Sequence, residues 1–417
     1  MNLFQLAAVF LTLVGIVGWL NVRWLRLPSA VAMLLVGLAG AGVLFPLRDA
    51  APQFEASAER VIGGVDFPET VLDYLLAFLL FAGAMQVDLS ELRRRVLPVL
   101  TLATLGVAAS TAVVGFGLWA VAGWLGAPLG LAWALVFGAL ISPTDPVAVL
   151  SALRGGELSK SLTAVLQGEA LFNDGVGIVA FTAAVALATS GAEIEPAATA
   201  GLVAVQALGG LGLGLAAGWV AVRAMRAIDD YSVEVSITLA LAAGSYAAAQ
   251  ALKVSAPIAV VAAGLVMGDR GIRTAMSDLT QRYVRGFWTL VDEILNALLF
   301  LLLGLQLLRL PIEPRWAAVW IAAIPLVLAA RFVTVLPWGA VFHYRYGERL
   351  PSLTLTWGGL HGALSVALAL SLPASPARNL ILSTTYAVVV FSVVVQGLTF
   401  APLVRRARQP ANGSATS

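Results

Sequence analysis

Apolar runs long enough to cross a membrane follow one another along almost the whole chain, from Leu3 to Val404. Many of them approach the ~20 residues that an α-helix needs to cross about 30 Å of hydrocarbon. Of the 417 residues, 60% are hydrophobic and 12% are charged, whereas a soluble domain carries about a quarter charged residues. The sequence therefore predicts an all-α protein with many membrane spans and no separate soluble domain.

Charged residues, prolines and glycines divide these runs into about thirteen predicted spans. The spans cover residues 3–22, 28–46, 69–87, 96–124, 129–153, 161–189, 197–225, 231–251, 255–268, 286–308, 315–342, 352–373 and 379–404. The first run has no basic segment before it, so it predicts a retained helix and not a cleaved signal. Residues 1–404 then form a single membrane domain, and 405–417 form a short, polar, disordered tail.

Basic residues are unevenly shared between the two sets of alternate loops. Of the 25 Lys and Arg residues, 18 fall in one set and six in the other, while Arg331 lies within a predicted helix. The six are Arg48, Arg60, Lys253, Arg309, Arg315 and Arg378. Because cytoplasmic loops carry the excess of positive charge, this distribution predicts an outside N-terminus and a cytoplasmic C-terminus. The first six and last six spans then have opposite orientations about the seventh, as in an inverted repeat.

Composition also excludes several classes of function. The formal net charge is only +2, and the basic residues lie in short clusters between apolar runs, so we expect no nucleic-acid partner. Cysteine is absent, which excludes disulfides and thiolate metal sites. We expect no cofactor.

Two of the predicted helices contain breaks. The fifth span contains Ile141-Ser142-Pro143-Thr144-Asp145-Pro146, and its two prolines remove backbone donors and clash with the preceding turn. The twelfth span contains Trp357-Gly358-Gly359-Leu360-His361-Gly362, whose three glycines loosen the helix. Interrupted helices at corresponding places in the two halves are typical of the central site of a transporter.

Ionisable side chains inside the predicted spans form the next clue. Glu169 and Asp174 share the sixth span, although inserting a carboxylate without a partner costs at least ~2.5 kcal/mol. Five residues separate them, which is about 140° around a helix, so they serve different faces. Arg331 is the one basic residue deep within a span and needs a partner. We therefore expect a buried Glu169–Arg331 pair, with Asp174 left for function.

Asp174 then lacks a fixed counter-charge. Burial disfavours the charged form of a carboxyl group, so such a group holds either a proton or a cation. That competition is sufficient for antiport if the site faces each side of the membrane in turn. Asn173 can orient the neighbouring carboxylate or the open fifth helix, and Thr144 supplies a hard oxygen ligand for a transient alkali cation. Asp145 either binds the ion or balances the partial charges of the opened helix ends.

The motifs Thr144-Asp145-Pro146, Phe172-Asn173-Asp174-Gly175 and Gly358-Gly359-Leu360-His361-Gly362 resemble those of the monovalent cation/proton antiporter family of the NhaP/NHE type. The resemblance covers essentially the whole chain and extends to Phe287-Trp288, Asn296 and Gly304-Leu305-Gln306.

The resemblance implies a secondary transporter, not an enzyme, with interrupted helices five and twelve crossing at the midplane. It implies a core domain at about 69–189 and 286–404 and a dimerisation or scaffold domain at about 1–46 and 197–268. Asp174 would carry the exchanged ion, and Asn173 would place the chain among electroneutral exchangers of one proton for one cation, most often Na⁺ or Li⁺. A homodimer in the lipid of a bacterial inner membrane, serving pH homeostasis, is the expected context.

Three positions depart from the family pattern. Ala82 stands where a carboxylate is common, and Ala170 follows Glu169 without a side-chain oxygen, so neither supplies a cation ligand. His361 replaces the usual arginine of the Gly-Leu-Arg-Gly motif. A histidine can change its charge near neutral pH, so His361 is either a neutral, hydrogen-bonded core residue or a pH sensor.

Other interpretations use the same residues. Asp292 and Glu293 lie about two turns from the cytoplasmic start of the tenth span, and we expect them to line a solvated funnel, with a second ion site as the alternative. A K⁺/H⁺ antiporter would need the same ion site. An intramembrane aspartyl protease built on Asp145 and Asp174 lacks the flanking motifs of that chemistry, and a cation channel would show no coupling to protons.

Overall fold

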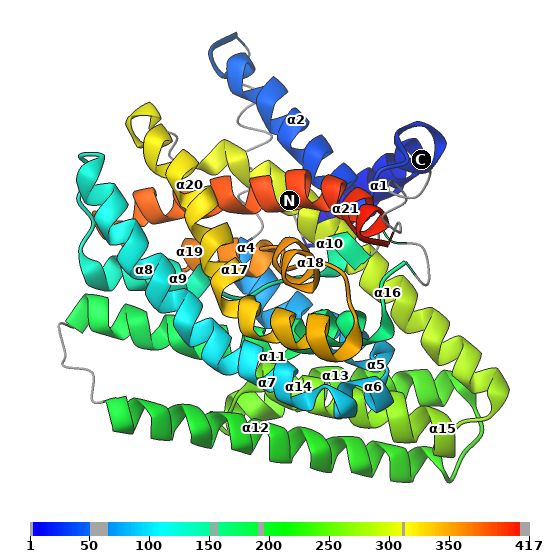
Figure 1. The fold of residues 1–417 in the computed structure, drawn as a ribbon. Helices are drawn as coiled ribbons and strands as arrows, with labels where there is room; N and C mark the ends of the chain where they lie inside the picture. The colour runs from blue at the N-terminus through cyan, green and yellow to red at the C-terminus, as the bar shows by residue number, and fades with distance from the viewer. Residues whose placement is uncertain are drawn as a thin grey trace, which may run out of the picture.

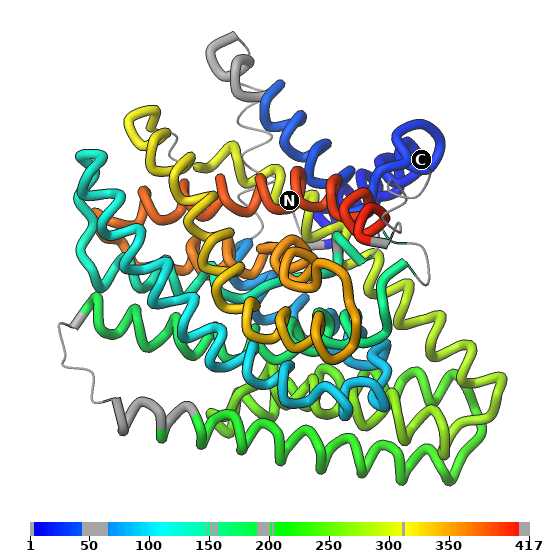
Figure 2. The backbone as a smooth tube through the Cα atoms, viewed as in Figure 1, coloured from blue at the N-terminus to red at the C-terminus, as the bar shows by residue number. Residues whose placement is uncertain are grey.

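A computed structural model describes residues 3–50, 66–150, 153, 157–190, 196–310 and 313–408. Within these ranges the regular structure is helical throughout and contains no strand, which confirms the predicted all-α class (Figure 1). Figure 2 follows the same path through the chain as a smooth tube. Arg60, one of the basic residues used for orientation, lies outside the described residues.

The helices match the predicted spans in order. Those of the first half are α1 (Leu3–Leu20), α2 (Ser29–Ala50), α4 (Phe67–Glu69), α5 (Leu76–Gln86), α6 (Leu89–Arg94), α7 (Val96–Thr101), α8 (Val107–Trp124), α9 (Leu131–Ile141), α10 (Val147–Leu150) and α11 (Lys160–Ser190). Those that follow are α12 (Pro196–Met225), α13 (Tyr231–Ala251), α14 (Ala256–Val266), α15 (Ile272–Ala275), α16 (Asp278–Leu305), α17 (Ala317–Tyr346), α18 (Pro351–Gly358), α19 (Ala363–Leu370), α20 (Arg378–Phe391) and α21 (Gly397–Arg408). Short π-helical segments join α4 to α5, α7 to α8 and α20 to α21.

In the described part of the chain, nine helical stretches are long and apolar enough to cross a membrane, and the bent pair α18–α19 makes a tenth. The shorter apolar helices Ser29–Val43 and Leu131–Ile141 account for two further predicted spans. These helices agree with a polytopic protein, while the count of thirteen spans and the inverted repeat stay predictions.

Two groups of helices face each other. In one group α2 packs on α16, and α14 packs on α5, α12 and α13. In the other group α8 packs on α9, and α17 packs on α8, α18 and α20, while α11 packs on α9 (Figure 1). At the α2–α16 contact a Cβ added to Gly304 would lie 2.8 Å from the Cα of Gly37, so the absence of side chains there permits the close approach.

Both predicted helix breaks are present. Helix α9 ends at Ile141 and α10 begins at Val147, because neither Pro143 nor Pro146 supplies a backbone donor. Helices α18 and α19 meet at a bend of 46°. The two breaks touch, since the backbone N–H of Asp145 donates to the carbonyl oxygen of Leu360 at 2.7 Å. Each break thus satisfies a backbone group that the other exposes.

Two boundaries differ from the sequence prediction. Helix α21 continues to Arg408, so residues 405–408 are helical where a disordered tail was expected, and the remaining tail lies outside the described residues. Helix α16 begins at Asp278, eight positions before the predicted span at 286. The first turns of α16 are polar, so the apolar pattern in the sequence does not include them. They are helical nevertheless, and the Ser277 side chain caps the helix by accepting a hydrogen bond from the Thr280 N–H.

Candidate ion-binding site

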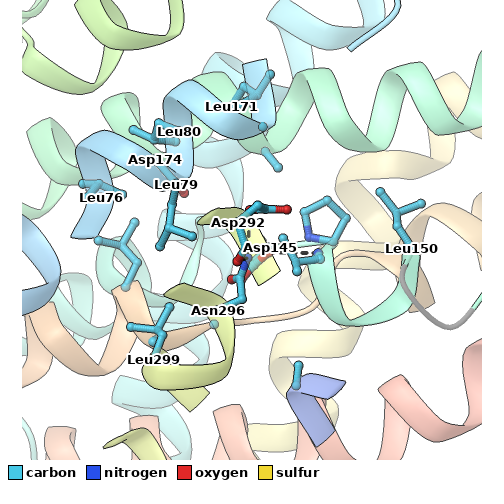
Figure 3. A pocket seen from close by; sticks show the side chains of 18 of the residues that line it. Leu76, Leu79, Leu80, Asp145, Leu150, Leu171, Asp174, Asp292, Asn296 and Leu299 are labelled. Atoms are coloured by element: carbon cyan, nitrogen blue, oxygen red, sulfur yellow. Dashed lines mark hydrogen bonds between the residues drawn. The ribbon is translucent and has the colours of Figure 1, made fainter. Parts of the chain in front are cut away.

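A cavity of about 450 Å³ lies where the two broken helices meet α5, α11 and α16. Much of its wall is apolar, including Leu76, Leu79, Leu80, Leu171 and Leu299 (Figure 3). Its polar lining consists of Ser29, Gln86, Thr144, Asp145, Gln167, Asp174, Thr289, Asp292, Glu293, Asn296 and Ser365. None of the described lining residues is Lys, Arg or His, so this part of the cavity is negatively charged wherever its carboxyl groups are ionised.

Asp174 projects from α11 into this cavity and keeps part of its surface exposed there. In the described part of the chain, its carboxylate accepts no hydrogen bond, although it interacts electrostatically with Asp145. The Asp174 carboxylate lies inside the molecule, away from bulk solvent, but an ion can reach it through the cavity. This carboxylate is therefore free to take up either a proton or a cation.

Asp145 lies in the gap between α9 and α10. One carboxylate oxygen, Oδ1, accepts from the backbone N–H of Val147 at 2.9 Å, which caps the short α10. Gly362 of the other broken helix faces the same carboxylate, and a Cβ there would lie 2.8 Å from Oδ2. Asp145 therefore both stabilises the opened helix and lines the cavity, so the two roles considered for it are compatible.

Asn173 and Thr144 bind each other. The amide Nδ2 of the fully buried Asn173 donates to the Thr144 hydroxyl at 2.9 Å, which ties α11 to the break after α9. Thr144 lines the cavity, whereas Asn173 does not. The amide oxygen of Asn173 has no hydrogen-bond partner within the described structure. Of the two roles expected for Asn173, this contact fits the one that orients the open helix.

Glu169 and Arg331 form a buried ion pair away from the cavity. Arg331 Nη2 donates to Glu169 Oε2 at 2.8 Å, and Nη1 donates to Oε1. Side-chain exposure is 8% for Arg331 and 2% for Glu169. The pair joins α17 to α11, so each charge offsets the desolvation of the other.

His361 lies behind the breaks, outside the cavity that holds Asp174. It is buried, its Nδ1 is 3.3 Å from the carbonyl oxygen of Pro143, and its backbone N–H donates to Ser392 Oγ at 3.0 Å. The Ser392 hydroxyl in turn donates to Gln396 Oε1 at 2.6 Å. Sequence reasoning missed Ser392 and Gln396, because nothing in their own segment marks them as partners of a distant helix break.

Asp292 and Glu293 line the cavity as well. The Asp292 carboxylate accepts from Asn296 Nδ2 at 2.9 Å and from Gln86 Nε2 at 3.4 Å. Gln86, at the end of α5, was missed because its role depends on how α5 packs against α16. No group of three acidic or histidine side chains in the described ranges has the arrangement of a resident metal site.

Comparisons with known proteins bear on the family and the fold. Residues 8–406 match a protein-family model described as "Sodium/hydrogen exchanger, transmembrane". The Na(+)/H(+) antiporter NhaP of Pseudomonas aeruginosa is 43% identical over 411 residues, covering 96% of each chain. The Na(+)/H(+) antiporter NhaH of Halobacillus dabanensis is 35% identical, covering 92% of this chain and 93% of the relative. The solved sodium proton antiporter MjNhaP1 of Methanocaldococcus jannaschii has the same fold, with a TM-score of 0.73, 20% identity and coverage of 98% and 99%.

Proposed function

Because the chain belongs to the sodium/hydrogen exchanger family, we propose that it exchanges protons for Na⁺ across a membrane, with Asp174 as the carboxylate that the two ions share. The family consists of secondary transporters, not enzymes. The observation that carries the proposal is the Asp174 carboxylate, which faces the cavity without a hydrogen bond inside the described structure. An ion that enters must displace the proton, so the two fluxes are coupled.

The oxygen atoms around Asp174 suit an alkali cation. Asp145 and the Thr144 hydroxyl line the same cavity and offer hard ligands. The side chains of Ala82 and Ala170 contain no oxygen, so neither can add a ligand for the cation. The relatives in the comparisons are named for sodium exchange, so we propose Na⁺ as the physiological cation ahead of K⁺.

We propose that alternating access moves the helices that carry Asp145 and Asp174 past a scaffold. The packing supports a scaffold built from α2, α5, α12, α13, α14 and α16, because these helices contact one another extensively. This division places 69–87 and 286–308 with the scaffold, whereas the sequence analysis placed them with the core. The apolar outer surface of the scaffold would contact lipid and, in a homodimer, a second copy of the chain.

We further propose that the cavity faces the cytoplasm in this state. Its lining includes Ser29 at the start of α2, Gln86 at the end of α5 and Leu150 at the end of α10. The basic residues predict that all three of these helix ends lie on the cytoplasmic side, with the N-terminus outside. Acid conditions in the cytoplasm would then favour the protonated site in the state that the structure represents.

Exchange of one proton for one Na⁺ follows if Asp174 alone changes its occupancy. Asn173, beside it, is uncharged and bound to Thr144, so it carries no second proton. The cycle would move no net charge. Transport in proteoliposomes should therefore be unaffected by an imposed membrane potential.

The experiment measures Na⁺-driven pH change in proteoliposomes for the wild type and Asp174→Asn. We expect the wild type to exchange with Na⁺ or Li⁺, protons to raise the KM for Na⁺ as competitors, and Asp174→Asn to show no coupled flux. Asp278→Asn, an exposed carboxylate on α16 outside the cavity, is the matched control. Coupled exchange in Asp174→Asn would refute the shared-site mechanism, and strong voltage dependence of the wild type would refute electroneutrality.

A further inference from the structure

Asp292 lies near the middle of α16. Because α16 begins at Asp278, Asp292 is 14 residues into this helix, or about 21 Å along its axis. Figure 3 shows its side chain in the cavity beside Asp145 and above Asn296. Sequence reasoning placed Asp292 only about two turns into its span. In the structure its side chain lines the wall of the cavity.

Two amide groups hold the Asp292 carboxylate in place. Asn296 Nδ2 donates to Oδ1 at 2.9 Å and also to the main-chain oxygen of Asp292, while Gln86 Nε2 approaches Oδ2 at 3.4 Å. Asn296 is 7% exposed, so the support is rigid. Neither donor carries a charge. Within the described residues, the Asp292 carboxylate is thus oriented by uncharged donors and has no basic partner.

The support belongs to the scaffold. Helix α16 packs on α2 at the contact of Gly304 with Gly37, and α5, which carries Gln86, packs on α14 and α16. Asp145 and Asp174 belong to the opposite wall, on the break after α9 and on α11. The cavity therefore lies between one carboxylate on the proposed scaffold and two on the proposed moving part.

Asp145, Asp174 and Asp292 line the same cavity. Asp292 interacts with Asp145, and Asp145 interacts with Asp174. When ionised, these carboxylates give the cavity a negative potential that attracts a cation, and no Lys, Arg or His is among its described lining residues.

We propose that Asp292 is a loading residue, which attracts a monovalent cation from the cytoplasmic side and passes it through Asp145 to Asp174. This inference rests on the proposed exchange function and adds a direction to it. When the core helices move, Asp145 and Asp174 leave the vicinity of Asp292, which stays on the scaffold. Asp292 therefore attracts the cation only when the site loads from the cytoplasmic side. It takes no part in ion binding from the external side.

The test measures the KM for Na⁺ separately from each side, in everted and right-side-out membrane vesicles of the full-length protein. For Asp292→Asn, which keeps the shape of the side chain, we expect the cytoplasmic KM to rise about fivefold. We expect the external KM and the maximal rate to change less than about twofold. Raising ionic strength with an impermeant organic cation should narrow the cytoplasmic difference, because screening weakens the attraction. Asp292→Glu should restore most of the lost affinity.

Asp278→Asn removes the same charge from the same helix outside the cavity and controls for general surface potential. An unchanged cytoplasmic KM in Asp292→Asn would overturn the proposal. Equal KM changes on both sides, or a lower melting temperature with a lower maximal rate, would also overturn it and assign Asp292 a structural role. Failure of the exchange function itself looks different, because the wild type would then show no coupled flux from either side.

Discussion

The guanidinium of Arg331 and the carboxylate of Glu169 form an ion pair with two hydrogen bonds in the interior. The two residues are 162 positions apart in the chain, and their contact joins α17 to α11. Arg331 Nη2 also lies 3.4 Å from the carbonyl oxygen of Leu355, at the helix that precedes the second break. The pair therefore connects three elements around the crossing of the broken helices. It supports the wall on which Asp174 lies without touching the cavity.

Removing one partner of this pair should destabilise the protein strongly. Glu169→Gln leaves the buried Arg331 charge uncompensated, and we expect the free energy of unfolding to fall by about 3–5 kcal/mol. Thermal unfolding in detergent measures the change. Arg315→Gln breaks the exposed Arg315–Glu313 pair and should cost less than about 1 kcal/mol. Equal effects of the two substitutions would show that burial of the first pair has no energetic consequence.

A methyl group at Gly362 should displace Asp145. The added Cβ would lie 2.8 Å from Asp145 Oδ2 and 3.0 Å from its Cβ, so the carboxylate must move. We expect Gly362→Ala to lower the exchange rate at least about tenfold. Gly244→Ala, in a helix where the added Cβ meets nothing within 4 Å, should leave the rate unchanged. Wild-type rates in Gly362→Ala would mean that the position of Asp145 does not matter.

The hydrogen bond between Asn173 and Thr144 should appear as an energetic coupling. Asn173→Ala and Thr144→Val each break the bond, so the double variant should lose less stability than the sum of the single variants. We expect a coupling of about 0.5–1.5 kcal/mol. Unfolding of all four proteins in one detergent gives this value. Strict additivity would argue that the 2.9 Å contact contributes nothing.

His361→Gln should leave the pH profile of exchange unchanged. The imidazole is buried against the Pro143 carbonyl and feels the positive charge of Arg331, so a further proton would place two like charges close together in a medium of low dielectric. A glutamine amide can still donate to that carbonyl. Proteoliposome assays across a pH series measure the profile, with the exposed His343→Gln as control. A shifted profile in His361→Gln alone would instead make His361 a pH sensor.

Several features of the site follow from local chemistry. A proline supplies no backbone donor in any context, so Pro143 and Pro146 predict the break after α9 without further information. A charge inside an apolar run is costly wherever the helix packs, so Glu169, Asp174 and Arg331 could be singled out by their positions alone. The positions of helix ends depend less on local sequence. Polar residues end the apolar run at the start of α16 and at the end of α21, although both helices continue.

The sequence by itself determined the class of protein, the broken helices and the buried charges, because lipid imposes the same cost on every polar group it surrounds. Only the tertiary structure decided that Asn173 turns to Thr144, that Gln86 and Asn296 hold Asp292, and that α5 and α16 pack with the scaffold. These contacts join segments that are far apart in the chain, and their geometry depends on how whole helices pack. No local pattern of residues contains that information.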